Sequence, residues 1–161
     1  MKGSDKTLIL IVGAVVLLVI GAVAAVLLRP EPEYRSGSTP DGVVHNYLLA
    51  LQLGDYERAY GCLHDDVKVK DLDDFIDSVE GRPYSFDLGS NVALSIDDES
   101  HISESSARVT VHKTETYNDL FGGSSYARDF NVRLKKENDQ WKISDSDDYW
   151  DYCWDKTSTC R

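Results

Sequence analysis

An uncharged apolar run near the N-terminus is the feature that most constrains how this chain can fold. The run extends from Leu8 to Leu28, and its 21 residues include no charged side chain and nothing polar beyond two glycines. As a helix with about 1.5 Å rise per residue it is roughly 30 Å long, which matches the hydrocarbon core of a bilayer. Backbone groups in lipid must bond within their own segment, so a helix is required there. The sequence predicts an N-terminal tail (1–7) and a transmembrane helix (8–28).

Two alternatives to an uncleaved membrane anchor fit the same run less well. A buried core helix would show a polar face, and this run has none. A cleaved signal peptide, which would give a secreted protein, fits the small-x-small triplet Ala22-Val23-Ala24, but apolar residues continue for four positions past Ala24. We therefore favour a single-pass anchor that uses residues 8–28 to bind the cell membrane.

The orientation in the membrane is only weakly encoded. Lys2 and Lys6 precede the run, whereas Arg29 and Arg35 follow it, so the positive-inside rule favours neither side. A tail this short usually stays in the cytoplasm, and a pair of cysteines near the C-terminus fits an oxidising compartment. We expect the C-terminal domain to lie outside the cytoplasm.

The remainder of the chain is strongly acidic. Residues 30–161 contain 14 Lys or Arg against 27 Asp or Glu. A surface of this charge excludes nucleic-acid binding through a basic face. The stretch 29–38 is rich in Pro, Gly and Ser, which is typical of a linker. The expected folded domain is residues 39–161, with an acidic, aromatic tail at its end.

Three helices are predicted at the start of this domain. Thr39 is a candidate N-cap with a proline at the first helical position, and Gly54 ends that helix. Asp55 caps a second helix, and Asp71 caps a third that closes at 81–83. Each helix carries an apolar stripe at helical spacing, so each needs a surface to cover.

From Tyr84 onward the apolar period changes from 3.6 to 2, which predicts strands. Four successive strands with polar or Gly-rich turns between them favour an antiparallel meander with one apolar face. Packing the three helices on that face gives a two-layer α+β domain. The alternating apolar residues are Val92, Leu94, Ile96, Val109, Val111, Tyr126, Phe130, Val132, Leu134, Trp141 and Ile143.

A resemblance to a known superfamily rests on two strings. TPDGVVHNYLLALQLGDYERAYGCL (39–63) resembles the opening of nuclear transport factor 2-like domains, and DQWKIS (139–144) resembles their last strand. The resemblance covers roughly residues 39–147 and implies that the sheet is curled and wrapped by helices into a cone with an apolar pocket. Members include isomerases, dehydratases, cyclases and transport adaptors, and they often pair through the sheet, so the resemblance implies a fold and a homodimer rather than one activity.

The predicted pocket would be lined by apolar and tyrosine side chains of the helix stripes and the inner strand face. No Asp or His falls on an inward position, so no catalytic residue is assigned, and core packing is the favoured role of the tyrosines. We expect an extracytoplasmic binding or interaction domain for a small apolar ligand or a protein; the alternative is a small-molecule isomerase, dehydratase or cyclase. The pocket-lining candidates are Tyr47, Leu51, Tyr60, Phe75, Val111, Tyr126, Phe130 and Trp141.

Two acidic clusters are candidate metal sites. His64-Asp65-Asp66 and Asp145-x-Asp147-Asp148 supply ligand atoms, but neither has zinc spacing or the pattern of a calcium-binding loop. A solvated acidic surface explains both, so no metal or cofactor is expected.

The three cysteines and the aromatic tail complete the predictions. Cys62 lies near an apolar stripe and is predicted to be a buried free thiol. Cys153 and Cys160 are the candidate disulfide, which would fix the C-terminus. Trp150 and Trp154 are expected to dock back onto the fold.

Overall fold

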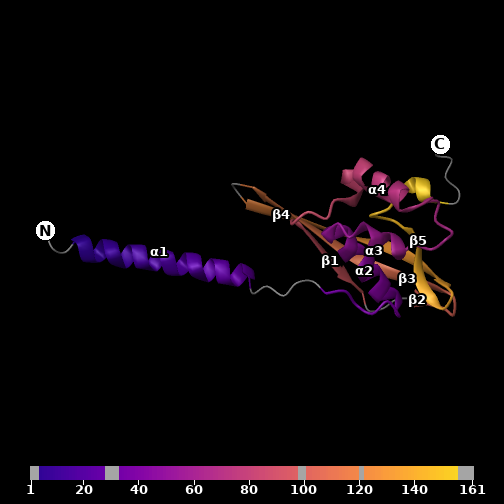
Figure 1. Cartoon of the computed structure of the whole chain (residues 1–161), viewed down its shortest axis with the longest axis horizontal. Coiled ribbons are helices and arrows are strands. Elements are labelled where there is room, and N and C mark those ends of the chain that lie inside the picture. The colour runs from indigo at the N-terminus through magenta and orange to yellow at the C-terminus, as the bar shows by residue number, and fades with distance from the viewer. Residues whose placement is uncertain (1–3, 28–32, 98–100, 120–121, 156–161) are drawn as a thin grey trace. The chain divides into compact units, whose positions relative to one another are not determined.

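The computed structural model describes residues 4–27, 33–97, 101–119 and 122–155 (Figure 1). Side chains are described for residues 10–22, 33–97, 103–117 and 122–155. Contacts divide the chain into two units, Met1–Glu33 and Tyr34–Arg161. Tyr34 packs on the second unit, with the Arg58 guanidinium 3.9 Å from the centre of its ring.

The first unit contains helix α1 (Ser4–Leu27). Its large apolar side chains between Leu10 and Ile20 are 50% to 73% exposed. Over the residues described, no helix combines the length and the apolar character that a membrane crossing requires.

The helices of the second unit begin and end where the capping residues predict. Thr39, Asp55 and Asp71 each accept a hydrogen bond from a backbone N–H three residues on, at 3.3, 3.2 and 3.0 Å. Gly54 ends the first of these helices with φ of 70°, a left-handed conformation that favours glycine. The helices are α2 (Pro40–Leu53), α3 (Tyr56–Gly61), α4 (Leu72–Gly81) and α5 (Pro83–Phe86).

The strands form one antiparallel sheet in the order β1-β3-β4-β5, and β2 also pairs with β3. The long β3–β4 ladder runs from Ser106 opposite Lys135 to Asp119 opposite Gly122. A parallel bridge between Leu63 and Ile143 ties the segment after α3 to the sheet. The strands are β1 (Val92–Ile96), β2 (His101–Ile102), β3 (Ser106–Asp119), β4 (Gly122–Glu137) and β5 (Gln140–Ser146).

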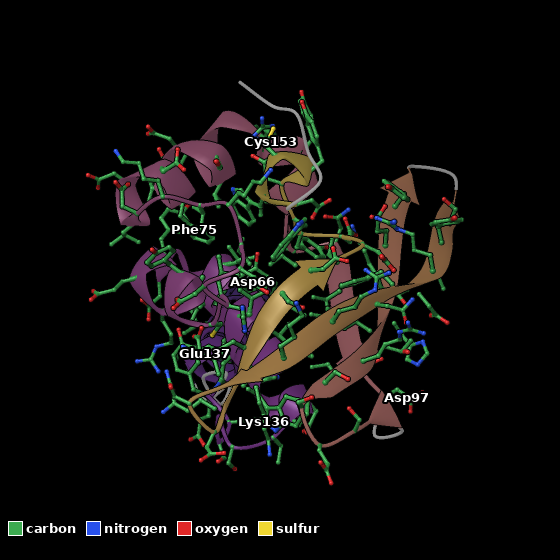
Figure 2. The ribbon with its side chains drawn as sticks, turned by 90° about the vertical axis from the view of Figure 1, so that its right-hand side faces the viewer. Asp66, Phe75, Asp97, Lys136, Glu137 and Cys153 are labelled. Carbon is green, nitrogen blue, oxygen red and sulfur yellow. The ribbon has the colours of Figure 1, made fainter. Side chains whose placement is uncertain are left out.

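The helices gather on one side of the twisted sheet, which makes two layers (Figure 2). The predicted α+β architecture, with helices on a four-stranded antiparallel path, is therefore confirmed for this unit. The core lies between the layers because the apolar stripes of the helices and the inner faces of the strands meet there. Its most buried members are Val44, Tyr47, Phe75, Val109, Val111, Val132, Leu134 and Ile143.

Two local elements differ from the sequence predictions. The strand pattern is predicted to begin after Tyr84, yet Pro83–Phe86 forms a helical turn, because proline fixes a helical φ at its first position. The short strand β2 lies between β1 and β3, where the sequence predicts a polar turn. It pairs with β3 through His101–Arg108 and Ile102–Ala107, a pairing that two residues of sequence do not reveal.

Candidate functional site

The interior between the helical layer and the sheet is where the sequence predicts a pocket. Six of the eight predicted lining residues are at most 9% exposed: Tyr47, Leu51, Phe75, Val111, Phe130 and Trp141. Tyr60 is half-buried and packs against the core. Tyr126 is the exception, because it is 59% exposed. Its strand parity is that of Phe130, but it lies on the part of the β3–β4 hairpin opposite Glu115, past the buried core positions of β4, so inward parity does not bury it.

Aromatic rings of the C-terminal segment fill this interior. Trp154 stacks on Phe75 with ring centroids 5.1 Å apart, and it meets Phe86 at 5.6 Å. Trp150 meets Trp154 edge-on at 5.1 Å. Such contacts bury large apolar areas and favour tilted or offset geometries like these. The predicted docking of Trp150 and Trp154 onto the fold is confirmed.

Four of the predicted lining residues are therefore packed core. Three surface hollows are bounded by described residues, and none of the three is lined by Tyr47, Phe75, Val111 or Phe130. Trp141 and Leu51 each reach the edge of one such hollow. These four side chains belong to one buried apolar cluster together with Tyr149, Trp150 and Trp154.

The buried hydroxyl of Tyr47 forms a hydrogen bond with the C-terminal segment. It donates a hydrogen bond of 2.8 Å to the backbone carbonyl of Tyr149, 102 residues along the chain. Burial raises the pKa of Tyr47 well above its ordinary value, so the hydroxyl keeps its proton. Tyr47 thus acts as a permanent donor that holds the tail against α2.

A charged cluster lies on the inner face of the sheet, beyond Val111. Lys113 on β3 is buried, and its ammonium lies 2.8 Å from Glu115 and 3.4 Å from Asp148. Arg128, directly opposite Lys113 on β4, bonds Asp148 at 2.6 Å. Two cations and two carboxylates thereby balance one another at this end of the interior, as buried charges require.

The pKa shifts in this cluster keep both kinds of group charged. Burial by itself lowers the pKa of Lys113, but the hydrogen bond to Glu115 and the charge of Asp148 outweigh it, and the pKa is raised. Hydrogen bonds from Lys113 and then from Tyr117, at 2.5 Å, lower the pKa of Glu115. A general acid or base needs a pKa close to neutral, and these groups are shifted the other way.

Tyr149 is the most unusual residue of the interior. Its backbone has φ of 53°, which is uncommon for a residue with a side chain. Its ring lies 5.7 Å from that of Phe130, and its hydroxyl is buried without a hydrogen-bond partner among the described residues. Burial raises the pKa of Tyr149, although Lys113, 4.9 Å from the ring centre, opposes the shift. The strain is offset by the packing and by the bond from Tyr47.

An ion pair connects the C-terminal segment to Arg82, the residue between α4 and α5. Asp151 is fully buried and pairs with Arg82. Its other oxygen accepts a hydrogen bond of 2.9 Å from the backbone N–H of Cys153, which lies in the single turn η1 (Tyr152–Trp154). The tail is thus held by one charged and several aromatic contacts.

The two acidic clusters considered as metal sites are engaged with cations. Asp66 pairs with Lys135 at 2.9 Å, and its backbone N–H donates to the Nδ1 atom of His64 at 3.0 Å. Asp145 and Asp147 both pair with Arg133. Within the described side chains, no three His, Cys, Asp or Glu come together in a way that could hold a metal ion.

The cysteines lie in different environments. Cys62 is a free thiol at the end of α3, as predicted, but the residue is half-buried rather than buried. Desolvation raises the pKa of its thiol to about 11. Cys153 is disulfide-bonded. Cys160, its predicted partner, lies outside the described residues.

The sequence pattern predicts the position of some charged residues of the interior and not of others. Lys113 and Glu115 share the parity of Val109 and Val111, so alternation alone places them on the inner face. The pairing of Arg82 with Asp151 joins residues 69 positions apart and depends on how the tail packs.

Comparison with known proteins gives similarities of fold only. No protein-family model matches the chain, and no curated protein matches it in sequence. Solved structures with a similar arrangement include an NTF2-like protein with a cystatin-like fold from Novosphingobium aromaticivorans (9% identity, 66% of this chain and 75% of that chain, TM-score 0.47).

A ketosteroid isomerase-like protein from Erwinia carotovora atroseptica is similar at 16% identity over 68% of this chain and 92% of that chain, with a TM-score of 0.46. The association domain of CaMKII from C. elegans is similar at 18% identity over 65% of this chain and 87% of that chain, with a TM-score of 0.44. At these values, membership of the nuclear transport factor 2-like superfamily stays a prediction.

Proposed function

We propose that this chain is a membrane-anchored binding domain, displayed outside the cytoplasm, whose interior serves stability rather than catalysis. The anchoring part rests on residues 8–28, which hold no charge. The observation that carries it is the exposure of the large apolar side chains of α1. An exposed apolar surface of this extent in water would drive aggregation, whereas lipid covers it without cost.

The choice of binding over catalysis rests on the filled interior. Trp154 and Tyr149 are buried between the helices and the sheet, and Lys113 and Glu115 have pKa values shifted away from neutrality. The outer face of the sheet and the β3–β4 hairpin carry exposed side chains that are open to recognition. A second copy of this chain is one partner that the resemblance implies, and sedimentation velocity on the detergent-solubilised chain tests it.

The extracytoplasmic side is supported by the disulfide state of Cys153, because such bonds persist in oxidising compartments. It is also consistent with an acidic surface, which anionic lipid headgroups on the cytoplasmic leaflet would repel.

Alkaline extraction of membranes tests the anchor. We expect the full chain to stay with the membrane at high pH, and the variant Val16→Lys/Leu17→Lys to be released, because two central charges cost several kcal/mol of insertion (about 2.5–3.5 each). A mature N-terminus after Ala24, found by mass spectrometry, would instead identify a cleaved signal peptide.

Labelling of intact cells tests the side of the membrane. Ser38 is exposed, and a Ser38→Cys substitution places a thiol on the surface of the second unit. We expect a membrane-impermeant maleimide to label it in intact cells when Cys62 is replaced by Ala. Labelling only after lysis would contradict the extracytoplasmic assignment.

A further inference from the structure

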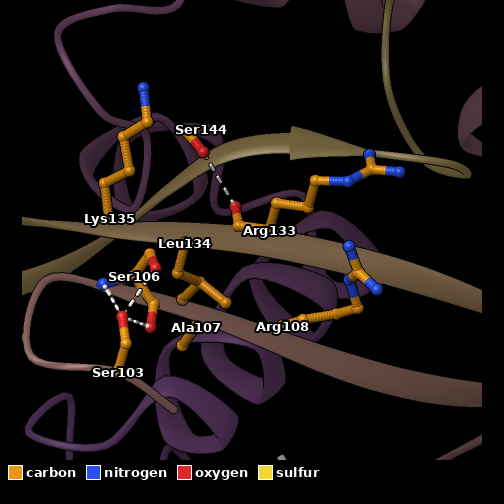
Figure 3. Close-up of a pocket in the computed structure, with 8 residues that line it drawn as sticks. All are labelled: Ser103, Ser106, Ala107, Arg108, Arg133, Leu134, Lys135 and Ser144. Carbon is orange, nitrogen blue, oxygen red and sulfur yellow. Dashed lines mark hydrogen bonds between the residues drawn. The ribbon is translucent and has the colours of Figure 1, made fainter. Parts of the chain in front are cut away.

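A hollow on the outer face of the sheet collects basic side chains on a unit that is otherwise acidic. It lies over the start of β3 and the end of β4, beside the turn that follows β2, and its volume is about 540 Å³. Its polar lining consists of Arg108, Arg133, Lys135, Ser103, Ser106 and Ser144 (Figure 3). No carboxylate is among the described residues that line it. Three of the 14 basic residues in 30–161 therefore meet at one place.

The register of the sheet forces two of these cations together. Arg108 on β3 lies directly opposite Arg133 on β4, and Lys135 lies opposite Ser106. Like charges at directly paired positions on one face destabilise a sheet. Figure 3 shows both guanidinium groups extending to the same side, away from Ser103. Asp145 and Asp147 offset the charge of Arg133, so the charge of Arg108 is the one that a bound anion would compensate.

A β-bulge shapes the floor of the hollow. Arg133 faces Asp145 while Leu134 faces Ile143, so Ser144 is the extra residue of β5. The Ser144 hydroxyl donates to the backbone carbonyl of Arg133 at 3.2 Å, which holds the bulge at the edge of the hollow. Bulges of this kind re-aim side chains and are frequent beside functional sites.

The three cations differ in how many of their N–H donors are already bonded to carboxylates. Arg133 pairs with Asp145 and Asp147, which uses two of the five N–H donors of a guanidinium. Lys135 pairs with Asp66 at 2.9 Å. The side chain of Arg108 forms no ion pair or hydrogen bond with any described residue. Arg108 is exposed and lines the hollow.

We propose that this hollow is a binding site for a phosphate group, with Arg108 as its main ligand and Arg133 and Lys135 as the flanking donors. A planar guanidinium fork bonds two oxygens of one phosphate, and a tetrahedral dianion keeps oxygens for a second guanidinium and an ammonium. Cationic forks in a hollow of a few hundred Å³ suit a phosphorylated small molecule or a lipid headgroup. The site is independent of the proposed membrane anchoring, since all its residues belong to the second unit.

Nuclear magnetic resonance of the ¹⁵N-labelled full chain in a maltoside detergent tests the site, with inorganic phosphate and then glycerol 3-phosphate as probes. We expect saturable shifts of the amides of 106–108 and 133–135. Arg108→Gln should weaken binding about tenfold or more, the loss typical of one charge-assisted hydrogen-bonding group. The same variant should not lower the urea midpoint, because the Arg108 side chain is exposed and forms no ion pair with a described residue.

Lys136→Gln is the matched control, because it removes the same charge from the neighbouring position of β4, where the side chain lies over Trp141. It should bind phosphate as the unaltered chain does. Equal losses in both variants, or an equal response to sodium chloride at matched ionic strength, would overturn the proposal. Spectra of the chain in nanodiscs of phosphatidylglycerol identify the source of the phosphate group. Shifts of the same amides without added phosphate would assign it to a lipid headgroup. Unchanged amides would assign it to a soluble ligand.

Discussion

At the scale of single residues, charge placement in this protein follows strand parity. Lys113 is buried because it continues the inner face of β3, and its ammonium is tolerated there only because Glu115 and Asp148 surround it. A buried ion pair of this kind contributes little net stability, but removing one partner leaves an uncompensated charge and costs about 3–5 kcal/mol. On the outer face, the next residue back, His112, forms a different and exposed pair.

His112 gives a pH-dependent prediction. Its Nδ1 atom lies 2.5 Å from Asp129, and its Nε2 atom lies 3.9 Å from Asp97. The hydrogen bond and charge of Asp129 raise the pKa of His112 above its ordinary value of 6.5. A raised folded-state pKa means that the protonated histidine stabilises the fold below the unfolded-state pKa, and that this contribution is lost as pH rises through the folded-state pKa.

We expect Asp129→Asn to move the pKa of His112 back toward its ordinary value, measured by the pH titration of its ring protons. The urea midpoint of the unaltered chain should fall more steeply above pH 6.5 than that of the variant. Asp97→Asn is the weaker comparison, because that carboxylate is farther from the ring. Identical titrations in the unaltered chain and in Asp129→Asn would contradict the assignment.

At the scale of elements, the C-terminal segment 149–155 fills the space between the helices and the sheet, and we call it the plug. It contains neither a strand nor a long helix. Its position depends on three kinds of contact: aromatic packing of Trp154, the bond from Tyr47 to the Tyr149 carbonyl, and the Arg82–Asp151 ion pair. These contacts come from α2, α4 and the residue between α4 and α5. The plug therefore links helices that are separated along the chain.

Truncating the central ring of the plug should destabilise the whole unit. We expect Trp154→Ala to lower the free energy of unfolding by about 3–5 kcal/mol, because it opens a cavity among Phe75, Phe86 and Trp150. Tyr152→Ala is the control, since this ring is 66% exposed and lies beside the Arg82 guanidinium at the surface. Urea denaturation of both variants measures the difference, and losses of similar size would contradict the role given to Trp154.

At the scale of the whole molecule, the second unit carries all the packing that we describe. Its core, its sheet and its plug involve residues from Tyr34 onward. We expect the fragment 34–161 to unfold in one cooperative transition, with the same midpoint as the second unit of the full chain in detergent. Circular dichroism during heating measures both. A midpoint lowered in the fragment by several degrees would show that residues 1–33 contribute to its stability.

Much of the architecture was predictable because its signals are local. Thr39, Asp55, Asp71 and Gly54 set helix limits through bonds that reach three or four residues, so the sequence alone locates three helices. Alternation likewise locates β1, β3, β4 and β5. The same local signals fail for Tyr126, because alternation reports a face of the sheet and says nothing of how far the helices cover it.

The apolar run 8–28, the acidic body, the helix caps and the strand faces were thus determined by the sequence itself, since each depends on composition or on neighbours within a turn. Only the tertiary structure decided that aromatic rings fill the interior, that Tyr47 holds the tail, and that Arg108 meets Arg133. These contacts join residues 25 to about 100 positions apart, and a shift of one residue in strand register would turn every side chain to the other face. Long-range packing selects that register, so no local pattern can encode it.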